Sequence, residues 1–253
     1  MRFIKQGGGQ MQPDPQKTVG ALLTKPDPLS AQQFLAEGIA RLNRVAMVSS
    51  FGADSAVLLH MVAQIDRALP VLFIDTLALF PETVAYQRAL AAHLRLSNVQ
   101  SISPDRTDLF TRDPDGLLHR SDAESCCQLR KSEPLSRALQ GYDGWITGRK
   151  RHQADTRALL QRAEVEPATG RIRLNPLADW DAQSVVDYLD AHDLPRHPLV
   201  AQGYPSIGCA PCTTRVNKGE DPRAGRWRGS AKTECGIHFT GGVPRPIRQE
   251  DAA

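Results

Sequence analysis

The sequence predicts a doubly wound, mostly parallel α/β sheet with a mobile segment at its C-terminal end. Three observations carry this prediction. Short apolar runs alternate with helical patterns over residues 30–102, which is typical of parallel strands joined by crossover helices. The first two runs each end in a loop of small or polar residues. A chain of 253 residues can also bury the core of one large domain.

The elements of the first half follow one another closely. Residues 1–28 contain Pro and Gly but little periodicity, and they are predicted to form a loose arm. A capping-box pattern at 30–33 opens a helix. The remaining expected elements are strands at 45–48, 71–74 and 99–102, with helices that begin at Ser55 and Pro81.

The second half is predicted to continue the sheet. A helix begins near residue 132, short strands are expected at 145–147 and 172–174, and a helix covers 181–192. We therefore divide the chain into the arm, an α/β domain at 29–212 that carries paired cysteines, and a basic segment at 213–253.

Composition excludes several classes of protein. The net charge of +3 is too small for a general polyanion binder, so no nucleic-acid partner is expected. The excess of basic residues is concentrated over 213–232, a stretch that could hold a small anion or simply be solvated. No apolar run reaches the ~20 residues of a membrane span, and no signal-peptide core is visible. The expected location is the cytoplasm, where thiols stay reduced.

Polar residues gather where the predicted strands end. The loop 49–55 follows the first strand, Asp75 and Thr76 follow the second, and the cationic run 148–152 follows a later one. Ligands of doubly wound sheets bind beyond the carboxyl ends of the strands, and helix N-termini favour anions. The pattern indicates an anionic ligand at this edge.

Five cysteines suggest two kinds of site. Four lie in close pairs, Cys126 with Cys127 and Cys209 with Cys212. They could be buried apolar residues, a zinc site or an iron–sulfur cluster. Adjacent side chains diverge and fit one zinc ion poorly, whereas a cluster offers separate irons, so spacing favours the cluster without excluding zinc.

Cys235 has no cysteine partner nearby. Its neighbours are Lys232, Glu234 and His238, and a thiol near cations has a lowered pKa and becomes a nucleophile. The alternative is a surface cysteine without function. Glycines at 225 and 236 indicate a mobile segment that could close on a substrate and open to a partner.

Taken together, the motifs resemble the thioredoxin-dependent adenylyl-sulfate (APS) reductases of assimilatory sulfate reduction, which serve cysteine biosynthesis. The resemblance is carried by the Cys-Cys pair followed by Arg130 and Lys131, by the Cys-Ala-Pro-Cys motif, and by Glu-Cys-Gly-Ile-His at 234–238. Supporting motifs are Ser-Phe-Gly-Ala-Asp-Ser at 50–55, Ile-Asp-Thr at 74–76 and Thr-Gly-Arg at 147–149. The match covers residues 45–238.

The resemblance implies a Rossmann-like fold of the adenine nucleotide alpha-hydrolase type and a specific chemistry. The paired cysteines would ligate a [4Fe–4S] cluster: Cys126, Cys127, Cys209 and Cys212. The Cys235 thiolate would attack the sulfur of APS, displace AMP and carry a thiosulfonate, from which thioredoxin would release sulfite.

The resemblance also implies the residues around the substrate. Those expected to act in catalysis are Cys235, Lys131, His238, Arg223 and Arg226. Those expected to bind the substrate are Ser50, Gly52, Ser55, Asp75, Thr76, Gly148, Arg149 and Arg157. The cations would screen the repulsion between a thiolate and an anionic substrate.

Four alternatives remain. A reductase of the 3′-phosphorylated substrate, PAPS, shares the fold and the Cys235 chemistry but usually lacks the four paired cysteines. ATP pyrophosphatases carry a similar loop, but here Phe51 replaces its first glycine and would crowd a close backbone approach. A non-enzymatic iron–sulfur redox sensor would not explain Cys235. A tRNA-thiolating enzyme would need an RNA-binding appendage.

Overall fold

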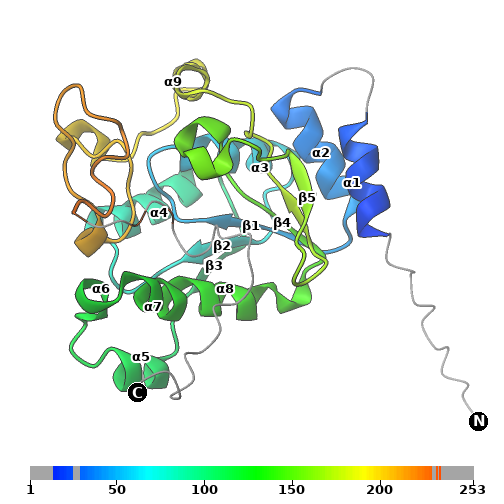
Figure 1. The fold of residues 1–253 in the computed structure, drawn as a ribbon. Helices are drawn as coiled ribbons and strands as arrows, with labels where there is room; N and C mark the ends of the chain where they lie inside the picture. Colours follow the sequence, from blue (N-terminus) through cyan, green and yellow to red (C-terminus); the bar gives the residue numbers. More distant parts are fainter. Residues whose placement is uncertain (1–13, 25–28, 230–231, 233, 235–253) are drawn as a thin grey trace, which may run out of the picture.

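The computed structural model describes residues 14–24, 29–229, 232 and 234, and its centre is a six-stranded sheet (Figure 1). The strand order is β3-β2-β1-β4-β6-β5. The strands are β1 Val45–Ser49, β2 Val71–Ile74, β3 Val99–Ile102, β4 Gly144–Ile146, β5 Ala163–Val165 and β6 Ile172–Leu174. All pairings are parallel except that of β5 with β6, so the predicted mostly parallel α/β fold is confirmed.

Nine α-helices connect and cover these strands in the described part of the chain. They are α1 Pro15–Leu23, α2 Ala31–Arg41, α3 Ser55–Ile65, α4 Pro81–His93, α5 Arg106–Arg112, α6 Leu118–Ser121, α7 Ala123–Cys127, α8 Glu133–Ala138 and α9 Ala182–Ala191. Among the residues described, no helix combines the length and the apolar character that crossing a membrane requires.

Alternation along the strands divides the core into two layers. Met47 and Phe73 face the larger layer, which α2, α3, α4 and α9 cover. Val48 and Trp145 face the opposite layer, which α8 covers. Figure 1 shows the same arrangement, with α7 and α8 along one side of the sheet and α3 and α4 on the other. Burial of both faces explains why β1 is apolar at nearly every position.

The strand order reverses direction between β1 and β4. From β1 the chain adds β2 and then β3 on one side, and it continues with β4 on the other side. Such a switch point leaves a crevice beyond the carboxyl ends of the two central strands. The loops that follow β1 and β4 therefore meet at the place where a ligand is expected.

The loose-arm prediction is wrong for Pro15–Leu23, because these residues form α1. The Asp14 carboxylate accepts hydrogen bonds from the backbone of Gln16 and Lys17, and Pro15 occupies the first turn. Val19 and Leu22 are buried in the main core. The helix packs beside α2 and β5, so tertiary contacts compensate for its weak sequence pattern. Residues 1–13 and 25–28 lie outside the described residues.

Gly144 allows β4 and β6 to approach closely. A Cβ at this position would lie 2.6 Å from the Ile172 carbonyl oxygen and 2.8 Å from Leu42 Cδ1. We expect Gly144→Ala to lower the free energy of unfolding by about 2–3 kcal/mol, since a backbone oxygen cannot move aside cheaply. Denaturant unfolding measures the loss. Gly141→Ala is the control, because nothing lies within 4 Å of its added Cβ; equal effects at the two sites would refute the steric account.

Candidate active site

A cleft of about 440 Å³ opens at the switch point of the sheet. Its walls come from the loop after β1, the segment after β4, and the chain around 205–207 and 221–226. Eight residues predicted to act on the substrate line it: Ser50, Gly52, Ser55, Gly148, Arg149, Arg157, Arg223 and Arg226. The structure therefore brings residues from four separate stretches of sequence to one cleft.

The loop after β1 keeps its bulky residue out of this cleft. Phe51 has a φ of 49° and is fully buried, with its ring packed edge-on against Phe73 at 5.4 Å between centroids. The left-handed backbone turns the ring into the core, and Phe51 does not line the cleft. The expectation that Phe51 crowds the ligand is therefore wrong. At the next residue, Gly52, an added Cβ would lie 3.3 Å from the Ile207 carbonyl oxygen, so the loop backbone passes close to that segment.

Two cations that follow β4 are buried, and each pairs with an acidic side chain that is itself partly exposed. Arg149 pairs with Glu164 and donates hydrogen bonds to Asn175 Oδ1, while burial and the nearby Arg173 lower its pKa to about 10. Lys150 donates to Asp54 Oδ2 at 2.8 Å, and its side chain is 1% exposed. Sequence reasoning did not select Lys150 or Asp54, although both border the cleft. The cationic run 148–152 was the signal for Lys150.

A third group of charges gathers around the carboxylate of Glu234. Arg157 lies on the 3₁₀ turn Asp155–Arg157 and holds the carboxylate of Glu234 through two hydrogen bonds. Arg223 Nη2 is 3.8 Å from the same carboxylate. Burial and the charge of Arg157 lower the pKa of Arg223. Arg226 shares this wall of the cleft, so positive charge is concentrated there.

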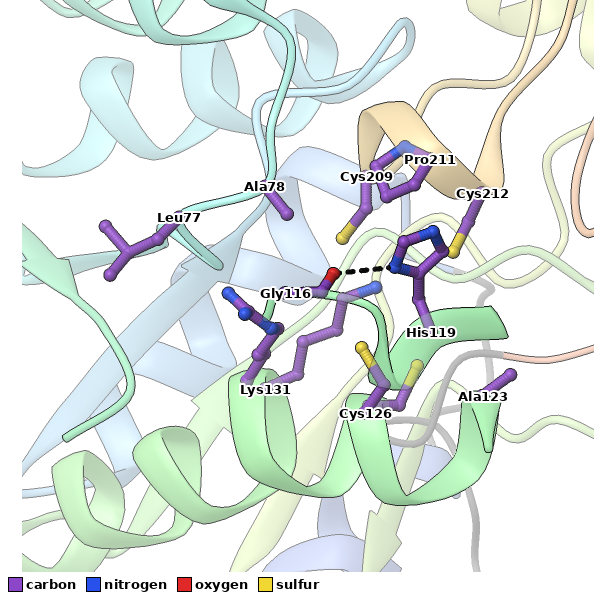
Figure 2. A pocket seen from close by; sticks show the side chains of 12 residues that line it. Leu77, Ala78, Gly116, His119, Ala123, Cys126, Lys131, Cys209, Pro211 and Cys212 are labelled. Carbon is purple, nitrogen blue, oxygen red and sulfur yellow. Dashed lines mark hydrogen bonds between the residues drawn. The ribbon is translucent and has the colours of Figure 1, made fainter. Parts of the chain in front are cut away.

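The four paired cysteines line one cavity of about 140 Å³. Cys126 and Cys127 end α7, while Cys209 precedes the 3₁₀ turn Ala210–Cys212 and Cys212 ends it. Figure 2 shows the thiols of Cys209 and Cys212 directed across the cavity toward Cys126. His119, which the sequence analysis missed, also lines it, with Nδ1 3.1 Å from the Gly116 carbonyl oxygen.

Local hydrogen bonds fix both cysteine-bearing segments. The Asp122 carboxylate caps α7 by accepting from the backbone of Glu124 and Ser125 at 3.0 and 2.9 Å. Cys209 forms a bridge with Leu79, and the Ala210 amide donates to the Ala78 carbonyl oxygen at 2.8 Å. The segment after β2 therefore attaches the downstream pair to the sheet.

The chemistry of this cavity favours a bound cationic group. Burial, opposed by the charge of Arg130 and assisted by the neighbouring Cys209 and Cys212, raises the pKa of the Cys126 thiol to about 11. Four thiolates can share such a space only with a metal centre between them. Adjacent Cys126 and Cys127 suit a multi-iron cluster better than one ion. In the described ranges, no group of three or more His, Cys, Asp or Glu side chains is placed so that it could hold a metal ion.

Arg130 ties the cysteine helix to the end of β2. It lies on the π-helical turn Gln128–Ser132 and donates to Asp113 Oδ2 from Nε and Nη2, at 3.1 and 2.6 Å. Its Nη1 donates to the Thr76 carbonyl oxygen at 3.0 Å. The Thr76 hydroxyl in turn lies 3.2 Å from Cys209 Sγ. Sequence reasoning missed Asp113, because the partners are 17 residues apart and no local pattern connects them.

Neutralising Asp113 should destabilise this buried pair. Burial alone would raise the pKa of Asp113, but the Leu118 amide and Arg130 outweigh it and hold the pKa below the ordinary value. Asp113→Asn is expected to lower the free energy of unfolding by about 3 kcal/mol at pH 7, since it leaves a buried guanidinium unpaired.

The pH dependence follows from the lowered pKa. The carboxylate stabilises the protein above the ordinary aspartate pKa of about 3.9 and loses this effect as the pH falls further. The difference between wild type and Asp113→Asn, measured by denaturant unfolding, should therefore shrink below that pH. Asp115→Asn, on the exposed neighbouring turn, should change stability by less than about 0.5 kcal/mol. If the difference in unfolding free energy between wild type and Asp113→Asn does not depend on pH, the ion pair is not its cause.

Lys131 stands between the cysteine cavity and the cleft. It is 7% exposed and lines both the cysteine cavity and an adjoining cavity of about 80 Å³. The adjoining cavity also contacts Ser50, Thr76, Cys209 and Arg226, which connects it to the cleft. One cation therefore borders the paired cysteines on one side and the ligand-facing loops on the other.

Three predicted residues are not placed in these cavities. The Asp75 carboxylate accepts from the Leu77 amide at 2.9 Å and lines none of the three. Cys235 and His238 lie outside the described residues. Their roles, like those of the other site residues, stay predictions.

Comparisons with known proteins agree with this arrangement. A family model described as "Phosphoadenosine phosphosulfate reductase domain" matches residues 44–215. The chain is 55% identical over 199 residues to a protein from Mesorhizobium japonicum named "Adenosine 5'-phosphosulfate reductase", with 79% of this chain and 78% of that protein covered. A protein of the same name from Chelativorans sp. is 50% identical over 239 residues, covering 87% and 97%.

A solved structure shares the fold. The phosphoadenylyl-sulfate (PAPS) reductase from Candida auris, in a phosphate complex, aligns with a TM-score of 0.66 and 28% sequence identity over 82% of this chain and 98% of that one. The resemblance inferred from the motifs is thus confirmed. The chain belongs to the phosphoadenosine phosphosulfate reductase family.

Proposed function

We propose that this protein reduces APS to sulfite and AMP in sulfate assimilation, with thioredoxin as the cytoplasmic electron donor. The observation that carries the proposal is the junction at Lys131, where a cavity lined by four cysteines adjoins a cationic cleft at the switch point. The names of the similar bacterial proteins support APS as the substrate.

The reaction balances as three successive displacements at sulfur. The Cys235 thiolate attacks the sulfur of APS, the bond from sulfur to the phosphate oxygen breaks, and AMP leaves with the electron pair. A thioredoxin thiolate then attacks Cys235 Sγ, and sulfite leaves with the pair of the S–S bond. The second thioredoxin thiol resolves the mixed disulfide, so the dithiol is oxidised as sulfate sulfur is reduced.

The cleft supplies charge for the first displacement. Arg223 and Arg226 would screen the approach of a thiolate to the substrate oxygens, and Lys131 would stabilise charge that develops on the leaving phosphate. The loop after β1, with Ser50, Gly52 and Ser55, would hold the nucleotide. His238 would contribute to the same screening of negative charge.

The paired cysteines would hold a [4Fe–4S] cluster: Cys126, Cys127, Cys209 and Cys212. Their placement around one cavity, the raised pKa of the Cys126 thiol and the adjacent pair all fit such a group. When bound, the cluster would supply an electrostatic and positioning influence through the neighbouring Lys131.

PAPS is the second candidate substrate, because the family model and the Candida auris structure both carry that name. The test is turnover of the cluster-loaded protein with thioredoxin and each nucleotide, with sulfite and the released nucleotide quantified. Sulfite with AMP from APS supports the proposal. Sulfite from PAPS alone would change the substrate assignment, and no sulfite from either would overturn the enzymatic reading.

A further inference from the structure

The carboxylate of Glu234 is held by two adjacent residues, Thr156 and Arg157, of which Arg157 lines the cleft. Arg157 Nε donates to Oε1 at 2.6 Å, and Arg157 Nη2 donates to Oε2 at 2.7 Å. The Thr156 hydroxyl donates to Oε1 at 3.1 Å. Both oxygens are thus held by a two-pronged guanidinium contact, the geometry in which an arginine–carboxylate pair is strongest and most directional.

This pair is buried, unlike most ion pairs on the protein. The side chains of Arg157 and Glu234 are 7% and 6% exposed. Burial alone would raise the pKa of Glu234, but the hydrogen bonds and charge of Arg157, together with Arg223 and Thr156, hold it below its ordinary value. Glu234 is therefore ionised at neutral pH, and separating the pair would leave a buried charge without its partner.

A second charge pair fixes the same stretch of chain two residues earlier. The Lys232 ammonium pairs with Glu124 on α7, the helix that ends in Cys126 and Cys127. Its side chain is 4% exposed, and its Nζ lies 6.0 Å from the ring centroid of Trp227. One short stretch is therefore attached to the cysteine helix at Lys232 and to the cleft at Glu234.

We propose that the Arg157–Glu234 pair is a docking contact, and that Glu234 is a positioning residue for the chemistry of Cys235. Glu234 directly precedes Cys235 in the sequence, so we expect a substitution that breaks the Arg157–Glu234 pair to change the reactivity of Cys235. The inference rests on the proposed function, in which Cys235 attacks a ligand in that cleft.

The contact also redefines Arg157, which the sequence analysis assigned to substrate binding. Its Nε and Nη2 are used by Glu234, and its Nη1 donates to Gln153. The guanidinium is thus engaged within the protein on each nitrogen. Arg223 and Arg226 line the same cleft, and we expect them to be the cations that the substrate anion meets.

Kinetics separate docking from substrate binding. In Glu234→Gln we expect thiosulfonate formation at saturating APS to slow about 100-fold, as for a displaced reacting group. The dissociation constant of AMP, measured by calorimetry, should change less than about threefold, because AMP binding does not need Cys235. Glu220→Gln is the matched control, since Glu220 pairs with Arg228 at the surface and should leave both values unchanged.

The double variant tests whether the two side chains act as one unit. Arg157→Gln together with Glu234→Gln should be no slower than the worse single variant, because neither buried charge then lacks a partner. If Arg157 instead binds substrate and Glu234 competes for it, Glu234→Gln will tighten AMP binding and leave the rate intact. That result would overturn the proposal.

Proteolysis tests the docking without any reaction. Trypsin should cut after Lys232 about tenfold faster in Glu234→Gln than in wild type or Glu220→Gln, because release of the contact exposes a buried site. Equal cleavage rates would overturn the docking contact. Failure of wild type to form a thiosulfonate from APS would instead contradict the proposed function. The proteolysis assay would still test the Arg157–Glu234 contact, because it requires no reaction.

Discussion

Cys235→Ser is expected to lower the rate of APS reduction by at least about 10⁴-fold, the range seen when a catalytic nucleophile is removed. A serine hydroxyl is not ionised at neutral pH, whereas a cysteine thiol supplies a reactive thiolate. Turnover assays of the cluster-loaded protein, quenched at fixed times and followed by quantification of sulfite and AMP, measure the fall in rate.

The same variant should keep its iron and its ligand. Cys235 is separate in sequence from the four cysteines that line the cavity, so iron content and AMP affinity should match those of wild type. Residual activity within tenfold of wild type would contradict the nucleophile assignment. Loss of iron in Cys235→Ser would instead place this thiol in the metal site.

Lys131→Met has the second largest expected effect, a fall of about 10²–10³-fold in kcat/KM. Methionine keeps the length and burial of the side chain but removes the charge that borders both the cysteine cavity and the cavity next to the cleft. A charge aimed at the leaving phosphate matters most in the transition state, so kcat should fall more than KM rises.

Iron content and a surface control separate catalysis from folding. Lys218→Met removes a charge from an exposed position and should leave kcat/KM within about twofold of wild type. Equal iron content in Lys131→Met and wild type would show that the loss is catalytic. A Lys131→Met enzyme with unchanged kcat/KM would contradict the role of this cation.

Much of the fold follows from local patterns. The expected strands at 71–74, 99–102 and 172–174 coincide with β2, β3 and β6. β2 is an apolar run that is buried at every position, as in the interior of a parallel sheet, whereas β3 is an edge strand with two exposed central residues. The helix from Ser30 begins with the predicted capping box. By contrast, α1 and the antiparallel β5 depend on packing against distant elements, which no periodicity reports.

The candidate site was predictable where residues cluster in sequence and not where partners meet across the fold. The four paired cysteines line one cavity, and the loops that follow β1 and β4 line one cleft, as expected. The pairs Arg130–Asp113, Lys150–Asp54 and Arg157–Glu234 join residues 17, 96 and 77 positions apart. Phe51 was misjudged because its direction depends on a left-handed backbone that a non-glycine residue rarely adopts.

The most direct test of the account is an intact-mass measurement with peptide mapping after the anaerobic, cluster-loaded protein is mixed with APS in the absence of thioredoxin. The account predicts one added SO₃ group, located on Cys235, absent from Cys235→Ser and lost when reduced thioredoxin is supplied. An unmodified protein after exposure to both APS and PAPS, or a modification on any other cysteine, would contradict it.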